Sequence, residues 1–171
     1  MSDDKQTYDY GCVMLYFNFP EIKNIHSLIN SEDIYTEEGD NSFGLEDEPH
    51  TTLLYGLHDG VTEEDVRNVV DNFDYGTCRL TNPSLFNSEK YDVLKYDVSG
   101  PNLHETNAEL TELPHTTSFP NYHPHLTIGY IKKGEGQKYA DKLKELNFKL
   151  DPTHIVYSLP SGEHIEIPIN V

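Results

Sequence analysis

The sequence reads "YHPHLTIGYI" at residues 122–131, an apolar run typical of a buried strand but preceded by two histidines and a proline. The seven residues "PHLTIGY" at 124–130 match "PHTTLLY" at 49–55 in the pattern Pro-His-x-Thr-x-x-Tyr. A residue before proline favours extended backbone, and proline is tolerated as the first residue of a strand. The repeat therefore predicts two strands that each begin at Pro-His.

The two predicted strands each present one imidazole beside one hydroxyl. Residues i and i+2 of a strand point to the same face, so His50 and Thr52 project together, as do His125 and Thr127. If the strands lie side by side around a pseudo-twofold axis, the four side chains line one cavity. That arrangement suits a phosphodiester, since one histidine acts as base, the other as acid, and the threonines bind the non-bridging oxygens. The sequence does not assign base and acid.

Short strands and helices alternate along the rest of the chain. The pattern predicts strands at 12–17, 50–57, 77–86, 91–98, 125–131, 154–159 and 164–169, and helices at 20–30, 62–73, 102–113 and 137–146. Residues 31–48 are acidic, contain glycine and lack periodicity, which indicates a loop. Because each Pro-His-x-Thr strand is followed by a helix, we expect an α+β fold with internal duplication, in one domain over residues 1–171.

A third copy of the motif, "PHTT" at 114–117, is followed by Ser-Phe-Pro. Pro120 disfavours a continuing strand, so we interpret this copy as a loop without a catalytic role.

The composition limits the partners. Thirty acidic and twelve basic side chains give a formal charge of −18, which disfavours long nucleic acids and anionic membranes. Any phosphate-bearing ligand should therefore be small. Cys12 and Cys78 lack CxxC spacing, and the first residues are acidic and polar with no apolar stretch, so we expect a protein of a reducing compartment, the cytoplasm.

Candidate substrate residues follow from the needs of a nucleobase, which stacks on aromatic rings and hydrogen-bonds through its edge. Tyr16, Phe86 and Tyr122 are predicted stacking residues. Glu163, in "SGEHIEIPI", is a predicted acceptor for a base amino group.

A zinc site is the main alternative for the histidines. His115, His123 and His125 lie close in sequence, and imidazole is a common zinc ligand. No cysteine or carboxylate accompanies them at a recognised spacing. We therefore predict no metal and no cofactor.

The two motifs, "PHTTLLY" and "YHPHLTIGYI", together with the order of strands and helices, resemble the 2H phosphoesterases, named for two His-x-Thr/Ser motifs. Within that superfamily the chain is most similar to the phage anti-CBASS phosphodiesterases, which destroy cyclic-nucleotide signals of bacterial immunity. The resemblance implies a bilobal (LigT-like) fold with the active site in a central groove. It also implies metal-independent cleavage with His50, Thr52, His125 and Thr127 as the catalytic set.

The expected function is cleavage of 3′–5′ bonds in cyclic di- or trinucleotides, in the host cytoplasm if the protein is viral. One alternative is a 2′,3′-cyclic phosphodiesterase for linear RNA ends. Another is a sponge that binds cyclic nucleotides without cleaving them, and a third is an interaction protein whose loop at 31–48 binds a basic partner.

Overall fold

The computed structural model describes residues 8–117 and 121–169, so Pro120 and the first seven residues lie outside the described part of the chain. The strands are β1 (Gly11–Asn18), β2 (His50–Leu57), β3 (Cys78–Asn87), β4 (Tyr91–Ser99), β5 (His125–Lys132), β6 (Phe148–Ser158) and β7 (His164–Pro168). The α-helices are α1 (Ile22–Ser27), α2 (Glu63–Val70), α3 (Leu103–Leu110) and α4 (Gln137–Leu143), and one 3₁₀ turn spans Ser31–Asp33.

The described strands form one sheet that closes on itself. Their order is β1-β2-β5-β4-β3-β6-β7, and an additional pairing of β1 with β6 joins the first six into a ring. Every pairing is antiparallel. β2 and β5 meet through the single pair Thr51–Leu126, whereas the other pairings are longer. The ring therefore has its narrowest junction where the two Pro-His-x-Thr strands meet.

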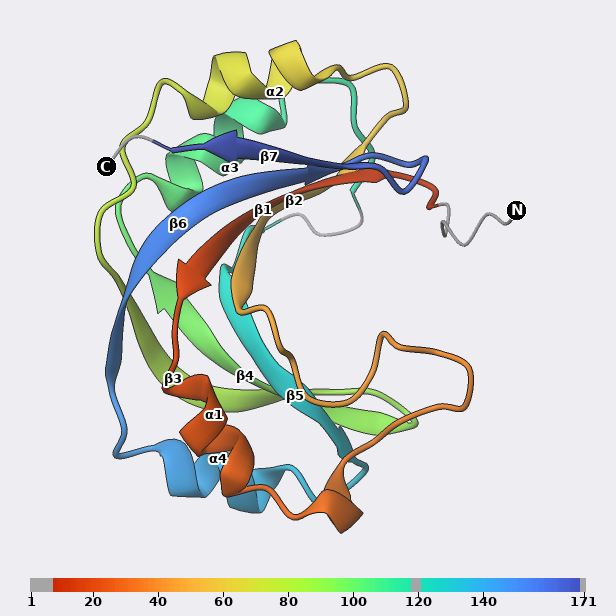
Figure 1. Ribbon diagram of the computed structural model, residues 1–171, viewed down its shortest axis with the longest axis vertical. Coiled ribbons are helices and arrows are strands. Elements are labelled where there is room, and N and C mark those ends of the chain that lie inside the picture. The colour runs from red at the N-terminus through yellow and green to blue at the C-terminus, as the bar shows by residue number, and fades with distance from the viewer. Residues whose placement is uncertain (1–7, 118–120, 170–171) are drawn as a thin grey trace.

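Two lobes follow from this arrangement (Figure 1). The upper lobe contains β1, β2, β7, α2 and α3, and the lower lobe contains β3, β4, β5, α1 and α4. β6 spans both, because its first residues pair with β3 and the remainder pairs with β1. α3 packs against β2, whereas α1 packs against β5 and α4 against β3 and β4. Buried apolar side chains of both lobes belong to one core cluster.

Most of the predicted elements are present, and the predicted start of α2 is confirmed in atomic detail. Thr62 Oγ1 accepts from the backbone N–H of Asp65 at 3.1 Å, and the Asp65 carboxylate accepts from the N–H of Thr62 at 2.9 Å. This capping box satisfies N–H groups that the first helical turn leaves without a partner. The third motif copy is a loop as predicted, since His115 belongs to no strand and forms an isolated bridge with Leu57.

One strand is longer than predicted. β6 begins at Phe148, six residues before the expected start, and continues through Pro152. Proline has no N–H for a central ladder bond. The register between β1 and β6 shifts at Tyr16/Phe17, where Phe17 faces Pro152, and this irregularity accommodates the proline.

The acidic loop is attached to the free edge of β5. The backbone N–H of Tyr35 donates to the carbonyl of Tyr130 at 2.9 Å, and that of Glu46 donates to Ile128 at 2.9 Å. Leu45 forms a bridge with Gly129, where a Cβ would lie 2.7 Å from Leu45 Cδ2. The loop therefore extends the sheet beyond the β2–β5 junction, and the glycine allows its close approach.

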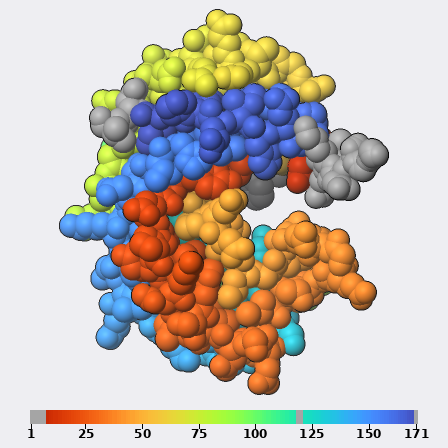
Figure 2. Space-filling view, in the orientation of Figure 1, coloured from red at the N-terminus to blue at the C-terminus, as the bar shows by residue number. Residues whose placement is uncertain are grey.

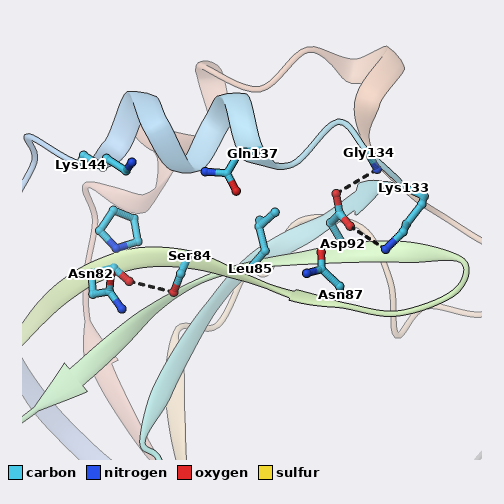
Figure 3. A pocket seen from close by; sticks show the side chains of 10 residues that line it. Asn82, Ser84, Leu85, Asn87, Asp92, Lys133, Gly134, Gln137 and Lys144 are labelled. Carbon is cyan, nitrogen blue, oxygen red and sulfur yellow. Dashed lines mark hydrogen bonds and ion pairs between the residues drawn. The ribbon is translucent and has the colours of Figure 1, made fainter.

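A polar cavity of about 510 Å³ lies between β3 and α4, beyond the end of β5 that is opposite to His125 (Figure 3). At its edge, buried Asp92 accepts from the N–H groups of Gly134 and Gly136 at 3.0 and 3.1 Å. Lys133 lies 3.6 Å from the same carboxylate. These contacts fix the turn from β5 into α4. No helix in residues 8–117 and 121–169 is long and apolar enough to span a membrane.

Candidate active site

The two His-x-Thr pairs lie on neighbouring strands at the junction of the lobes. Thr51 of β2 is opposite Leu126 of the antiparallel strand β5. When this antiparallel register is extended by one residue in each direction, His50 lies beside Thr127 and Thr52 lies beside His125. Thr51 and Leu126 are fully buried, whereas the four motif side chains are half-buried on the other face of the strands. The predicted side-by-side arrangement of the two strands is confirmed.

The two imidazoles are held in the same way. Nδ1 of His50 lies 2.9 Å from the carbonyl oxygen of Glu48, and Nδ1 of His125 lies 3.2 Å from that of His123. In both cases the carbonyl belongs to the residue two positions earlier. Since a carbonyl only accepts, Nδ1 carries the hydrogen, which leaves Nε2 to accept a proton when the ring is neutral and to donate one when it is charged.

The surroundings of His50 are acidic and aromatic. Glu46 Oε1 lies 3.8 Å from Nδ1 of His50. Burial raises the pKa of the Glu46 carboxyl, and the charge of His50 opposes that shift. The ring of Tyr16 lies between the imidazoles of His50 and His154, with centroids 5.0 and 5.1 Å apart. The acidic loop therefore brings a carboxylate to the first histidine.

The surroundings of His125 contain a cation. Lys95 of β4 lies opposite Thr127, and Asp97 lies opposite His125. Lys95 Nζ donates to Asp97 Oδ1 at 2.7 Å, and the Phe86 ring meets that of His125 edge to face at 4.8 Å. Burial lowers the pKa of His125, Lys95 and His50 lower it further, and the His123 carbonyl and Asp97 oppose the shift.

A cavity of about 530 Å³ opens beside His125, a size typical of small-molecule sites. Its walls come from β3, β4, the start of α3 and the segment before β5, and include Phe86, Lys95, Asp97, His104 and His123. The space-filling view shows the molecule hollowed between the lobes, with the acidic loop on the lower side (Figure 2). The cavity beside His125 lies between β3 and β4 of the lower lobe and α3 of the upper lobe, in agreement with the predicted groove.

The four residues predicted to bind substrate lie in different surroundings in the structure. Phe86 is 42% exposed and borders the cavity beside His125. Tyr16 has a stacked imidazole on either side, so both faces of its ring already contact other rings. Burial, with the carboxylates of Glu48 and Glu46, raises its pKa to about 12, which keeps its hydroxyl protonated.

Tyr122 and Glu163 make other contacts. The Tyr122 hydroxyl donates to the carbonyl of Thr52 at 2.8 Å, so this half-buried side chain supports β2. Glu163 is exposed in the turn between β6 and β7, where its carbonyl accepts from the N–H of Leu159 at 2.8 Å. The proposed base contacts of both residues stay predictions.

Three residues that the sequence reasoning did not single out join the motif pairs: Lys95, Asp97 and His154. Lys95 and Asp97 lie two residues apart in a predicted strand with apolar neighbours, so the sequence indicates that both side chains lie on one face. Their place beside the second motif depends on strand register, which the pattern alone does not give. His154 is likewise brought to Tyr16 by the pairing of β1 with β6.

The zinc alternative has no support among the described residues, where no three His, Cys, Asp or Glu side chains are grouped closely enough to hold a metal ion.

Comparison with known proteins gives matches at the level of structure alone. No family model matches the sequence. No curated protein matches it either. A structure of Usb1 from Kluyveromyces marxianus with uridine monophosphate is 12% identical over 94% of this chain and 98% of that chain, with a TM-score of 0.59. A crystal structure of a phosphoesterase is 14% identical over 93% and 95% of the two chains, with a TM-score of 0.47. The chain therefore has a fold similar to that of this Usb1 structure, and the predicted bilobal α+β fold is confirmed.

Proposed function

We propose that this protein is a metal-independent phosphodiesterase of the 2H type that cleaves 3′–5′ bonds in a small cyclic di- or trinucleotide. The observation that carries the proposal is the junction of β2 and β5, which brings together two imidazoles with equivalently tethered Nδ1 atoms and two threonines. One neutral and one protonated imidazole suffice for phosphodiester transfer. The charge of −18 favours a small ligand over long RNA.

The charges around the two histidines suggest their roles. His125 is half-buried, and burial together with the charges of Lys95 and His50 favours its neutral form, although the His123 carbonyl and Asp97 oppose this. His50 is the second imidazole at the junction, and its Nδ1 lies 3.8 Å from Glu46 Oε1. His125 therefore acts as the base and His50 as the acid.

The reaction follows from these roles. Nε2 of His125 takes the proton of a ribose 2′-hydroxyl, whose oxygen attacks the adjacent phosphorus. The bond from phosphorus to the 5′-oxygen breaks, and Nε2–H of His50 gives its proton to that oxygen. Thr52 and Thr127 donate hydrogen bonds to the non-bridging oxygens, on which negative charge increases. The products are a 5′-hydroxyl and a 2′,3′-cyclic phosphate. In the viral case, this reaction removes an anti-phage (CBASS) signal.

Incubation with cyclic di- and trinucleotides in excess EDTA, followed by mass-resolved chromatography, tests the proposal. We expect linear products with 2′,3′-cyclic phosphate ends, whereas 2′-deoxy rings stay intact because they lack the attacking hydroxyl. Intact ribonucleotide rings would overturn the signal-cleaving role. Recovery of bound, uncleaved ring after heating the complex would then favour a sponge.

A second candidate is cleavage at linear RNA ends, which the resemblance of the fold to a Usb1 structure containing uridine monophosphate favours. Linear oligoribonucleotides with 3′-hydroxyl or 2′,3′-cyclic phosphate ends belong in the same assay. Faster turnover of these than of any ring would support this candidate.

The role assignment predicts a pH dependence. His125 acts while neutral, so activity falls as the pH drops through its pKa, which burial lowers. We expect the acidic limb of kcat/KM below the ordinary histidine value of about 6.5. Steady-state rates between about pH 4 and 9 measure it, and a limb above the ordinary value contradicts His125 as the base.

A further inference from the structure

Lys95 is a nearly buried cation within the candidate active site. Its side chain is 10% exposed. Removal of an ammonium from water is unfavourable unless hydrogen bonds and opposite charge compensate. Its contacts here are the Asp97 carboxylate at 2.7 Å and the Phe86 ring, whose centroid lies 4.7 Å from Nζ. The placement of this lysine therefore needs an explanation beyond packing.

Those two contacts leave hydrogen-bonding capacity unused. An ammonium has three N–H donors, and the Asp97 carboxylate accepts one of them, while the Phe86 ring attracts the charge through its face. Asp97 is itself held, because its Oδ2 accepts from Asn82 Nδ2 at 2.9 Å. The Lys95 ammonium is thus held by the Asp97 carboxylate, and its other N–H groups can donate to a ligand.

The position of Lys95 fits an anion that reacts between the histidines. Lys95 lies opposite Thr127 in the β4–β5 ladder and lines the cavity that His125 also lines. Among the described residues that line this cavity, Lys95 is the only lysine or arginine. Glu46 and Asp97 lie beside the two histidines, so a phosphate there needs a compensating positive charge.

We propose that Lys95 donates a hydrogen bond to a non-bridging oxygen of the scissile phosphate, with Asp97 and Phe86 holding its ammonium in place. This inference rests on the proposed phosphodiesterase function and adds a residue outside the two His-x-Thr motifs. As negative charge builds on the phosphate oxygens in the transition state, a preorganised cation stabilises it more than it stabilises the bound substrate.

Lys95→Met tests the proposal by kinetics. We expect kcat to fall by about 10²- to 10³-fold with a smaller change in KM, since the contact strengthens in the transition state. Lys133→Met is the matched control, because it removes the same charge from an exposed lysine just beyond the C-terminal end of β5. Activity of Lys95→Met within threefold of that of Lys133→Met would overturn the proposal.

A binding measurement separates this inference from the proposed function. Calorimetric titration with uridine monophosphate and with inorganic phosphate should give weaker binding to Lys95→Met than to the wild type and Lys133→Met. If the wild type cleaves no nucleotide yet shows this difference, the proposed function fails and the phosphate contact stands. If the wild type cleaves but the three proteins bind equally and turn over equally, the phosphate contact fails.

Two further variants exclude a merely structural role. Lys95→Met/Asp97→Asn removes both charges, so thermal unfolding shows whether an unpaired Asp97 affects the fold, and we expect this folded variant to stay as inactive as Lys95→Met. The acidic limb of kcat/KM should move up in Lys95→Met and down in Asp97→Asn, because these charges act oppositely on His125. A double variant with wild-type kcat would overturn the proposal.

Discussion

Replacement of His125 or His50 by alanine is expected to lower turnover of the cyclic nucleotide by about two to four orders of magnitude. Each variant removes one proton transfer at the reacting phosphate and leaves the other histidine in place. Because the two act in one step, the double variant should lose less than the product of the single losses. Single-turnover assays with mass detection measure all three.

The third motif copy provides a matched control. Nδ1 of His115 lies 2.9 Å from the carbonyl of Leu113, the same local contact that holds His50 and His125. His115→Ala should therefore keep wild-type activity. If it loses activity as the other two do, the effect reflects the local fold, and the catalytic assignment of His50 and His125 is contradicted.

A substrate with a better leaving group tests which histidine is the acid. A nucleoside 3′-phosphodiester of p-nitrophenol releases a weak base, so its departure needs little help from an acid. His50→Ala should regain most of its activity on this substrate, whereas His125→Ala should not. Recovery by His125→Ala instead would reverse the assignment.

Removal of the hydroxyl of Thr127 or Thr52 should also lower activity strongly, with a fall in kcat of about 10²-fold. Thr→Val keeps the side-chain shape and removes a hydrogen-bond donor that faces the non-bridging oxygens. KM should change less than kcat, because that bond strengthens as charge develops in the transition state. Steady-state kinetics on the cyclic nucleotide give both constants.

Thr51→Val is the internal control for these variants. Thr51 lies on the same strand as Thr52 but is fully buried on the opposite face. Its replacement by valine should leave kcat within about twofold, within the scatter of such mutational effects. Equal losses in Thr51→Val and Thr52→Val would assign the effect to strand packing and contradict a phosphate contact.

The elements of this fold are readable from sequence because their signals are local. Pro-His before an apolar run marks the starts of β2 and β5, and the Thr62/Asp65 capping box marks the start of α2. Alternation then gives the face of each strand, which is why the relation of His50 to Thr52 was predictable.

The remaining features depend on contacts between distant residues. Pro152 is a signal against a strand, and the bulge that tolerates it exists only when β1 is paired. The sequence of the acidic loop has no periodic pattern, since contacts with β5, such as that of Leu45 with Gly129, fix its conformation. Lys95 reads as an ordinary polar strand residue until the register sets it opposite Thr127. Local patterns carry no information of this kind.

The pairing of β1 with β6 has a consequence for synthesis of the protein on the ribosome. Cys12 pairs with Ser158, so the apolar strand β1 lacks one of its two neighbours until the distant strand β6 has been synthesised. Such non-local pairing forms slowly, and an unpaired apolar edge is prone to aggregate. The nascent chain therefore carries an unpaired edge of β1 until β6 is synthesised, and we expect chaperones to bind at this edge.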